Sequence, residues 1–479
     1  MRQREAVHCN LIGDQWVGGA PTPNVNPSDW ADEIGLYAHA DASQLGAAVA
    51  AARAAFETWS VSSPQTRFDV LDRAGTLILE RRDTLGQLLA REEGKILAEA
   101  TAEVVRAGMV LKFFAGEAVR MAGDRMDSVR QGVDVEVTRE PVGVIAIITP
   151  WNFPIAIPAW KLGPALAFGN TVVFKPAELT PGCAHALVSI LREAGLPTGV
   201  VNLVMGRGSV LGDALLDSPD IDGVSFTGSV PTGRRIAARC AQATKRVQCE
   251  MGGKNPMVVL DDADMNVAIA ACINGAFFST GQRCTASSRL IVTKGVHERF
   301  IKAMSERVAS LKVGSALDPA TEIGPVVDQK QFESNLDYLD LAHNEGAKIV
   351  GGQKVKQATE GWFLSPALLL DTTPSMRVNR EEIFGPIASV IRVADYEEAV
   401  AVANDTEFGL SAGICTTSLR HARDFKRRAR AGMVMVNLPT AGVDYHAPFG
   451  GRRASSFGPR EQGSYAREFY TIVKTCYTG

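Results

Sequence analysis

Short apolar runs alternate with longer amphipathic stretches through the middle of the chain. Between about 142 and 252 the runs are VGVIAIIT, TVVFKPA, VVNLVMG, DGVSFTG and KRVQCEM, and helix-like stretches such as 182–194 and 210–216 separate them. Strands that alternate with helices indicate βαβ units, and wholly apolar runs are typical of strands buried on both faces of a parallel sheet. The pattern therefore predicts an α/β fold with a unit large enough to bind a nucleotide.

The segments on either side of this unit follow other patterns. The first 120 residues read as mostly helical after a short irregular start, because apolar residues recur at helical spacing over 41–59 and 68–89. A second α/β series runs from 263 to about 437, and its candidate strands are SSRLIVT, AKIVGG and ASVIRV. By contrast, VDVEVTRE near 140 and REFYTIVKT near the C-terminus alternate between polar and apolar positions. Such alternation predicts exposed antiparallel strands that seek partners at a sheet edge.

Length and composition narrow the class of protein. A chain of 479 residues is too long for one ordinary hydrophobic core and should form two or three domains. Its 46% hydrophobic and 22% charged residues are typical of a globular protein. The longest apolar stretch is about eight residues, whereas a membrane-spanning helix needs about 20, and the N-terminus lacks the apolar core of a secretory signal. We therefore expect no membrane span.

Charge and cysteine content exclude further classes. The net charge of -3 comes with no basic block, which disfavours a nucleic-acid-binding protein. Eight cysteines are too few for a disulfide framework, and without a CxxC or Cys/His cluster they predict no metal site. These features favour a reduced, cytoplasmic α/β enzyme.

Polar segments rich in glycine and proline follow three of the predicted strands. They are TPWNFP at 149–154, KPAE at 175–178 and FTGS at 226–229, with Gly233 four residues further on. Ligands of open parallel sheets bind at the carboxyl ends of strands. Gly228 and Ser229 also open a helix, where free backbone N–H groups and the helix dipole suit a phosphate. Together the three segments predict a nucleotide site.

A second group of residues suggests covalent chemistry. Glu250 begins EMGGKNP, and 34 residues later Cys284 stands in GQRCTA. A lone cysteine is more often an inert core residue, yet the neighbouring Gly281 and the small residues that follow suit a nucleophile at the start of a helix. A thiol needs a base or a helix dipole to react at neutral pH. Because none of the seven histidines stands in a motif, we expect this base to be a carboxylate.

The motifs TPWNFP, KPAE, SFTGS, EMGGKNP, GQRCTA and EEIFGP, in this order and spacing, resemble those of the aldehyde dehydrogenase superfamily over essentially the whole chain. The resemblance implies that Cys284 attacks an aldehyde and that Asn152, with the backbone N–H of Cys284, holds the resulting oxyanion. It also implies that Glu250 activates the water that hydrolyses a thioester. Members that transfer the acyl group to coenzyme A lack this glutamate, so its presence disfavours them.

The resemblance further implies a nicotinamide cofactor. Glu178 and Lys175 would bind the adenosine ribose, and the carboxylate at 178 should repel a 2′-phosphate, which favours NAD over NADP. Family members with the same glutamate sometimes accept NADP. Ser229 and Trp151 would meet the pyrophosphate, and Glu382 and Phe384 would position the nicotinamide ribose and ring. The full set of expected cofactor-binding residues is Thr149, Trp151, Lys175, Glu178, Gly208, Gly228, Ser229, Gly233, Met251, Glu382 and Phe384.

The family fold combines a Rossmann-type cofactor domain, an α/β catalytic domain and a small β-stranded arm. Arms of this kind pair between subunits, so the resemblance implies a homodimer or homotetramer. The expected division is 1–120 and 142–250 for the NAD-binding domain, 251–440 for the catalytic domain, 441–464 for a return to the cofactor domain, and 121–141 with 465–479 for the oligomerisation arm.

The substrate is suggested by the C-terminal part of the chain. The stretch from 433 to 451, together with GPREQG at 458–463, is similar to the branch of the family that oxidises 2,5-dioxovalerate to 2-oxoglutarate. Asn437 and Phe449 of this stretch are expected to contact the substrate. Arg283, beside the nucleophile, could hold the carboxylate of a semialdehyde acid or could form a structural salt bridge. The alternatives are oxidation of succinate or glutarate semialdehyde, or an inactive binding or structural protein on the same fold.

Overall fold

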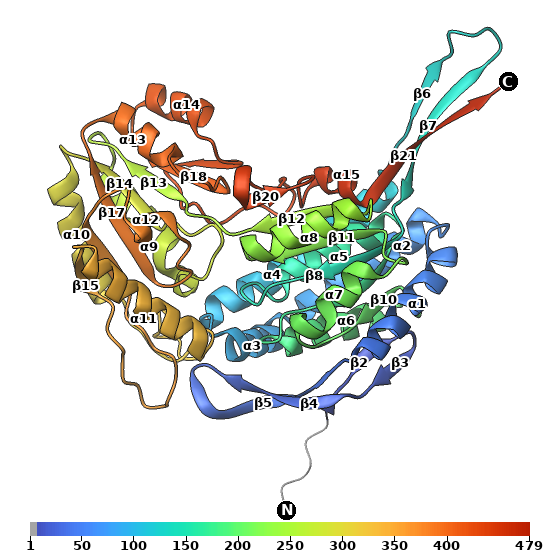
Figure 1. Cartoon of the computed structure of the whole chain (residues 1–479), viewed down its shortest axis with the longest axis horizontal. Coiled ribbons are helices and arrows are strands. Elements are labelled where there is room, and N and C mark those ends of the chain that lie inside the picture. Colours follow the sequence, from blue (N-terminus) through green and yellow to red (C-terminus); the bar gives the residue numbers. More distant parts are fainter. Residues whose placement is uncertain (1–6) are drawn as a thin grey trace, which may run out of the picture.

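The computed structural model describes residues 7–479, and Figure 1 shows two large sheets flanked by helices and a narrow arm that projects from one side. The first sheet has the strand order β20-β12-β11-β8-β9-β10-β2-β3. Its five central strands are parallel and confirm the five apolar runs. They are β8 (Val144–Ile148), β9 (Thr171–Lys175), β10 (Val201–Leu203), β11 (Gly223–Gly228) and β12 (Arg246–Met251).

Helices cover this sheet, and most of the predicted ones are present. Asp41 caps α1 and Ser63 caps α2, each by accepting a backbone N–H with its side-chain oxygen. Gly94, with φ of 90°, ends α3 in the left-handed conformation. The helices are α1 (Ala42–Trp59), α2 (Pro64–Glu80), α3 (Arg82–Glu93), α4 (Leu97–Val119), α5 (Ala156–Ala167), α6 (Pro181–Glu193), α7 (Gly208–Asp217), α8 (Val230–Gln242) and α15 (Arg467–Tyr470).

Residues 7–39 differ from the expectation of an irregular start, because they form strands, and the part of that expectation that falls on residues 1–6 lies outside the described residues. Pro21 and Pro23 lie within β4, and prolines in a run argue against a strand when only the sequence is considered. Pairing with β5 overrides that preference. The strands are β1 (Val7–His8), β4 (Ala20–Asn26) and β5 (Asp29–His39) in a small sheet, and β2 (Asn10–Ile12) and β3 (Gln15–Val17) at the edge of the first large sheet.

The second large sheet has the order β15-β16-β17-β14-β13-β18-β19. Three of its strands were expected at SSRLIVT, AKIVGG and ASVIRV. The strands are β13 (Pro256–Val259), β14 (Arg289–Thr293), β15 (Lys348–Gly351), β16 (Ala367–Thr372), β17 (Ile387–Val393), β18 (Ser411–Cys415) and β19 (Met433–Val436), and the helices are α9 (Met265–Phe277), α10 (His297–Ser310), α11 (Gln329–Asn344), α12 (Arg377–Arg380), α13 (Tyr396–Asn404) and α14 (Leu419–Arg428).

The projecting arm is a three-stranded antiparallel sheet, as the alternating pattern predicted. β7 (Asp134–Pro141) pairs on one side with β6 (Asp124–Asp127) and on the other with β21 (Thr471–Thr478). Most side chains of β6 and β21 are exposed, including Ile472, Val473 and Tyr477. The arm therefore presents apolar side chains to its surroundings.

The two large sheets meet where the chain leaves β12. After Met251 only four residues lead to Pro256, the first residue of β13 in the second sheet. β20 (Ser456–Phe457) later returns to the first sheet and pairs with β12, opposite Glu250. Residues from both halves of the chain are thus brought together at this junction. Across residues 7–479, no helix is long and apolar enough to cross a membrane.

Candidate active site

Cys284 lies in a turn that leads into β14, and not at the start of a helix as the sequence suggested. The short 3₁₀ helix Phe278–Gly281 precedes it, and Ser279, Thr280 and Gly281 all have positive φ values, of 51°, 55° and 66°. This left-handed stretch stops the helix and turns the chain. Cys284 is half-buried and lines a cavity of about 730 Å³.

The surroundings of Cys284 keep its thiol protonated. Burial raises the pKa of Cys284 to about 12, and the nearby carboxylates of Glu382 and Glu250 act in the same direction, whereas backbone N–H groups oppose the shift. No helix begins at Cys284, so no helix N-terminus lowers this pKa. A base must remove the proton before the sulfur can act as a nucleophile.

Asn152 lies beside the nucleophile loop. Its side-chain amide, Nδ2, donates to the carbonyl oxygen of Gln282 at 2.9 Å, two residues before Cys284. The second N–H of this amide remains available for a ligand oxygen. The side chain is buried, with 3% exposure, so a hydrogen bond from it would be strengthened by the low local dielectric.

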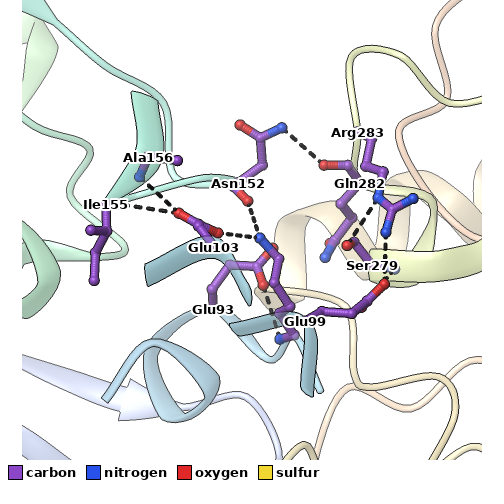
Figure 2. A network of polar contacts seen from close by, with 10 residues as sticks. Glu93, Glu99, Glu103, Asn152, Ile155, Ala156, Ser279, Gln282 and Arg283 are labelled. Carbon is purple, nitrogen blue, oxygen red and sulfur yellow. Dashed lines mark hydrogen bonds and ion pairs between the residues drawn. The ribbon is translucent and has the colours of Figure 1, made fainter. Parts of the chain in front are cut away.

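A buried charged network fixes the loop that carries Asn152 (Figure 2). The Lys95 ammonium donates to the Asn152 carbonyl oxygen at 2.7 Å and to Oε2 of Glu103 at 2.6 Å. Oε1 of Glu103 accepts the N–H groups of Ile155 and Ala156 at 3.0 and 3.1 Å. The side chains of Lys95 and Glu103 are each 1% exposed. Sequence reasoning missed both residues.

Glu250 is held at the end of β12. Its Oε2 accepts a hydrogen bond from Ser456 Oγ at 2.6 Å, across the pairing of β12 with β20. Burial raises the pKa of Glu250 well above its usual value, and the neighbouring Glu461 adds to this, whereas Ser456 and Lys161 favour the charged form. A carboxyl group whose pKa is raised in this way can accept a proton at neutral pH, as a general base must.

The residues expected to bind the adenosine part of a cofactor lie at the carboxyl ends of β9 and β11. The Lys175 ammonium bonds only to the Pro176 carbonyl oxygen, at 3.0 Å, among the described residues. One oxygen of Glu178 accepts the N–H of Gly208 at 2.9 Å, which leaves the other free. Ser229 caps α8 without using its hydroxyl on the helix backbone, so the N–H groups of the first turn stay available for a phosphate. These residues fit a dinucleotide.

Of the two residues expected at the nicotinamide end, Glu382 and Phe384, the first lies close enough to Cys284 to affect its pKa, and Trp151 and Thr149 belong to the same expected cofactor site. One carboxylate oxygen of Glu382 accepts the N–H of Gly253 at 2.9 Å, and burial raises the pKa of Glu382 to about 7. The ring of Phe384 stands edge-on to that of Trp151, with 5.4 Å between centroids. The hydroxyl of Thr149 is buried and has no hydrogen-bond partner among the described residues, so it can form a hydrogen bond to a ligand.

Three glycines and Met251 shape the floor of this region. A β-carbon at Gly233 would collide with the sulfur of Met251, so the glycine lets α8 approach β12 closely. At Gly228 a β-carbon would strike the ring of Phe226. At Gly208, by contrast, a β-carbon would make only an ordinary contact with Lys175, and the residue acts through its backbone N–H toward Glu178.

The three expected substrate residues have different positions. Phe449 lines the cavity with Cys284, and its ring packs 5.4 Å from that of Trp160. Arg283 also lines the cavity, but its Nη2 forms an ion pair with Glu99 Oε1 at 2.6 Å and its Nε donates to Ser279 Oγ at 3.0 Å. The structural salt bridge foreseen as one alternative is therefore present.

Asn437 does not line the cavity. Its side chain accepts the backbone N–H of Thr416 and donates to the carbonyl oxygen of the same residue, each at 3.0 Å. It also has a φ of 56°, a conformation that asparagine tolerates better than most residues. These bonds hold the end of β18, and a substrate contact of Asn437 stays a prediction.

Comparison with known proteins agrees with this geometry. The family model described as "Aldehyde dehydrogenase family" matches residues 16–476. The chain belongs to this family. An α-ketoglutarate semialdehyde dehydrogenase of Haloferax volcanii is 43% identical over 98% of both chains, and an α-ketoglutaric semialdehyde dehydrogenase of Bacillus subtilis is 39% identical over the same shares.

Solved structures of aldehyde dehydrogenases match the whole fold. The crystal structure of betaine aldehyde dehydrogenase from Staphylococcus aureus in complex with NAD+ has a TM-score of 0.96 and 32% sequence identity, and the match covers 99% of this chain and 95% of that one. The expected fold class is confirmed. The protein is thus an oxidoreductase that acts on aldehydes, and the inactive-protein alternative is not favoured.

Proposed function

We propose that this aldehyde dehydrogenase oxidises 2,5-dioxovalerate, which is α-ketoglutarate semialdehyde, to 2-oxoglutarate with NAD as cofactor. The observation that carries the proposal is the near full-length similarity to two enzymes named for this substrate. The cavity beside Cys284 supports it, because apolar rings and charged side chains line it together. Such a lining suits a short carbon chain with a carboxylate at its far end.

The side chains support a reaction through a covalent intermediate. An ionised Glu250 accepts the Cys284 proton, and the sulfur then bonds to the aldehyde carbon while the amide of Asn152 donates to the new oxyanion. Glu382 and Phe384 would hold the nicotinamide end of a bound cofactor, which would supply the hydride acceptor for this carbon. Glu250 releases the Cys284 proton to solvent and then accepts a proton from water, the resulting hydroxide attacks the thioester, and the Cys284 sulfur leaves as the thiolate. The product is a carboxylic acid.

The preference for NAD rests on Glu178. Its carboxylate, held by the N–H of Gly208, stands where the adenosine ribose is expected and would repel a 2′-phosphate. Lys175, which lies nearby, would donate to the ribose hydroxyls. Replacement of Glu178 by glutamine should therefore raise kcat/KM with NADP relative to that with NAD, and an unchanged ratio would contradict this role.

We also propose that the first large sheet belongs to the cofactor domain, the second to the catalytic domain, and that the arm joins subunits into a homodimer or homotetramer. Exposed Ile472, Val473 and Tyr477 on β21 support the last point, because they would be covered by a partner. Light scattering should show an oligomer that dissociates when charged residues replace these three. The free state of all eight cysteines supports a reducing compartment such as the cytoplasm.

A panel of aldehydes tests the substrate. NADH formation should be measured with 2,5-dioxovalerate, succinate semialdehyde, glutarate semialdehyde and betaine aldehyde, and kcat/KM should be highest for 2,5-dioxovalerate. A higher kcat/KM for either of the other semialdehydes would assign the enzyme to that acid. A preference for betaine aldehyde, which carries a positive charge, would overturn the proposal.

A further inference from the structure

One face of α4 places a row of charged side chains along the cavity. Glu99, Glu103 and Arg106 are spaced four and three residues apart, so they lie on the same side of the helix, and all three line the cavity that contains Cys284. The two carboxylates are neutralised by cations from elsewhere in the chain. Arg283 pairs with Glu99 and Lys95 pairs with Glu103, each at 2.6 Å.

Arg106 has no such partner. Among the residues described by the structure, no carboxylate forms an ion pair with it, and its one hydrogen bond runs from Nη2 to the neutral side chain of Gln462 at 3.0 Å. Its Nε is buried and without an acceptor in the same part of the chain. Asp444, the other acidic residue that lines the cavity, is exposed and forms no ion pair with Arg106.

A half-buried guanidinium without a counter-ion is costly, and a bound anion would offset that cost. The surroundings of Arg106 also indicate the shape of this anion. The guanidinium carbon lies 5.9 Å from the ring centroid of Trp160, which packs against Phe449, and both rings line the cavity. A carboxylate at Arg106 would therefore be joined to an aliphatic chain that runs along these rings toward Cys284.

We propose that Arg106 binds the carboxylate of the semialdehyde substrate, whereas Arg283 remains paired with Glu99 and holds the loop that carries Cys284. This inference rests on the proposed function and deepens it, because it names the residue that distinguishes an acidic aldehyde from a neutral or cationic one. The guanidinium has a free nitrogen, Nη1, that makes no hydrogen bond to any described residue and can pair with a carboxylate oxygen.

The test compares two arginines of the same cavity. The variants Arg106→Gln, Arg106→Lys and Arg283→Gln should be assayed with 2,5-dioxovalerate and with pentanal, a neutral aldehyde of the same chain length. In Arg106→Gln the ratio of kcat/KM for the two aldehydes should fall roughly 10- to 150-fold, because a charge-assisted hydrogen bond is lost for one substrate only. Arg106→Lys keeps the positive charge but cannot form two parallel hydrogen bonds to a carboxylate, so the ratio should fall by less than in Arg106→Gln.

Arg283→Gln is the matched control and should damage both substrates alike, since its guanidinium is held by Glu99. A ratio that collapses in Arg283→Gln but not in Arg106→Gln would overturn the proposal, and so would equal losses for both aldehydes in Arg106→Gln. If Arg106→Gln does not fold, the test rests on Arg283→Gln. A ratio of kcat/KM for the two aldehydes that equals the wild-type ratio supports Arg106 as the residue that binds the carboxylate, whereas a collapsed ratio assigns this role to Arg283.

The outcomes also separate this proposal from the proposed function. A wild-type enzyme that prefers pentanal or betaine aldehyde to 2,5-dioxovalerate would refute the function itself, before any variant is compared. A wild-type enzyme that prefers 2,5-dioxovalerate but keeps this preference in Arg106→Gln would refute only the role of Arg106. Inhibition by glutarate gives an independent measurement, because with pentanal as substrate it should be at least about 10-fold weaker in Arg106→Gln than in the wild type.

Discussion

The replacement of Lys95 by methionine should damage both stability and catalysis. Methionine fills most of the volume of the lysine stem but cannot donate to Glu103 or to the Asn152 carbonyl oxygen, which lie 2.6 and 2.7 Å from the ammonium. Because both side chains of the ion pair are 1% exposed, removal of one partner should lower the free energy of unfolding by about 3–5 kcal/mol. Loss of the Asn152 contact should lower kcat by up to about 10²-fold, through misplacement of the oxyanion donor.

A second variant separates the two effects. In Lys95→Met with Glu103→Gln both charges of this ion pair are removed, and the glutamine oxygen can still accept the N–H groups of Ile155 and Ala156. The double variant should regain stability relative to Lys95→Met but not kcat, since the Asn152 carbonyl still lacks its donor.

Thermal unfolding and steady-state kinetics on the same preparations measure both quantities. Lys112→Met, on α4, is the control, because the pair of Lys112 with Asp72 is 30% and 40% exposed and should contribute at most about 1 kcal/mol. A wild-type kcat in Lys95→Met would refute the positioning of Asn152 by this network, even if stability falls.

Three further predictions concern the chemical steps. Cys284→Ser should abolish NADH formation while NAD binding, measured by calorimetry, stays close to that of the wild type; turnover near the wild-type rate would rule out covalent catalysis. Glu250→Gln should slow the NADH burst, because Cys284 must then lose its proton to solvent, and should slow steady-state turnover still more, because thioester hydrolysis also loses its base; unchanged steady-state turnover in rapid mixing would exclude Glu250 as the base. Ser456→Ala removes a hydrogen bond that favours ionised Glu250. The pKa of Glu250 should then rise further, so the acid limb of the kcat profile should move to higher pH, and an unmoved limb would contradict this.

The apolar runs of the parallel sheet could be read from the sequence because each strand is buried on both faces. Val144–Ile148 and Thr171–Lys175, for example, are almost wholly buried, so every position favours an apolar or small residue. The strands near the N-terminus could not be found in this way. Their prolines and asparagines mask the pattern, and pairing between distant segments stabilises them instead.

The catalytic residues could be predicted from motifs, whereas the residues that support them could not. Lys95, Glu103 and Arg106 lie in a stretch that reads as an ordinary charged helix. Only the structure shows that this face of α4 points into a cavity and that two of these charges are paired. Likewise, the salt bridge of Arg283 could not be predicted from the sequence, because its partner Glu99 lies 184 residues away in the chain. The prediction of a helix start at Cys284 was wrong because Ser279 and Thr280 adopt left-handed conformations, which serine and threonine rarely adopt and which the sequence therefore does not indicate.

The most direct test of the account is the mass of the trapped intermediate. Glu250→Gln, mixed with NAD and 2,5-dioxovalerate and quenched with acid, should carry one 2-oxoglutaryl group per NADH released in the burst. Peptide mapping should place this group on Cys284, and the double variant with Cys284→Ser should carry none. An NADH burst without an acylated Cys284, or an acyl group on another residue, would contradict the mechanism.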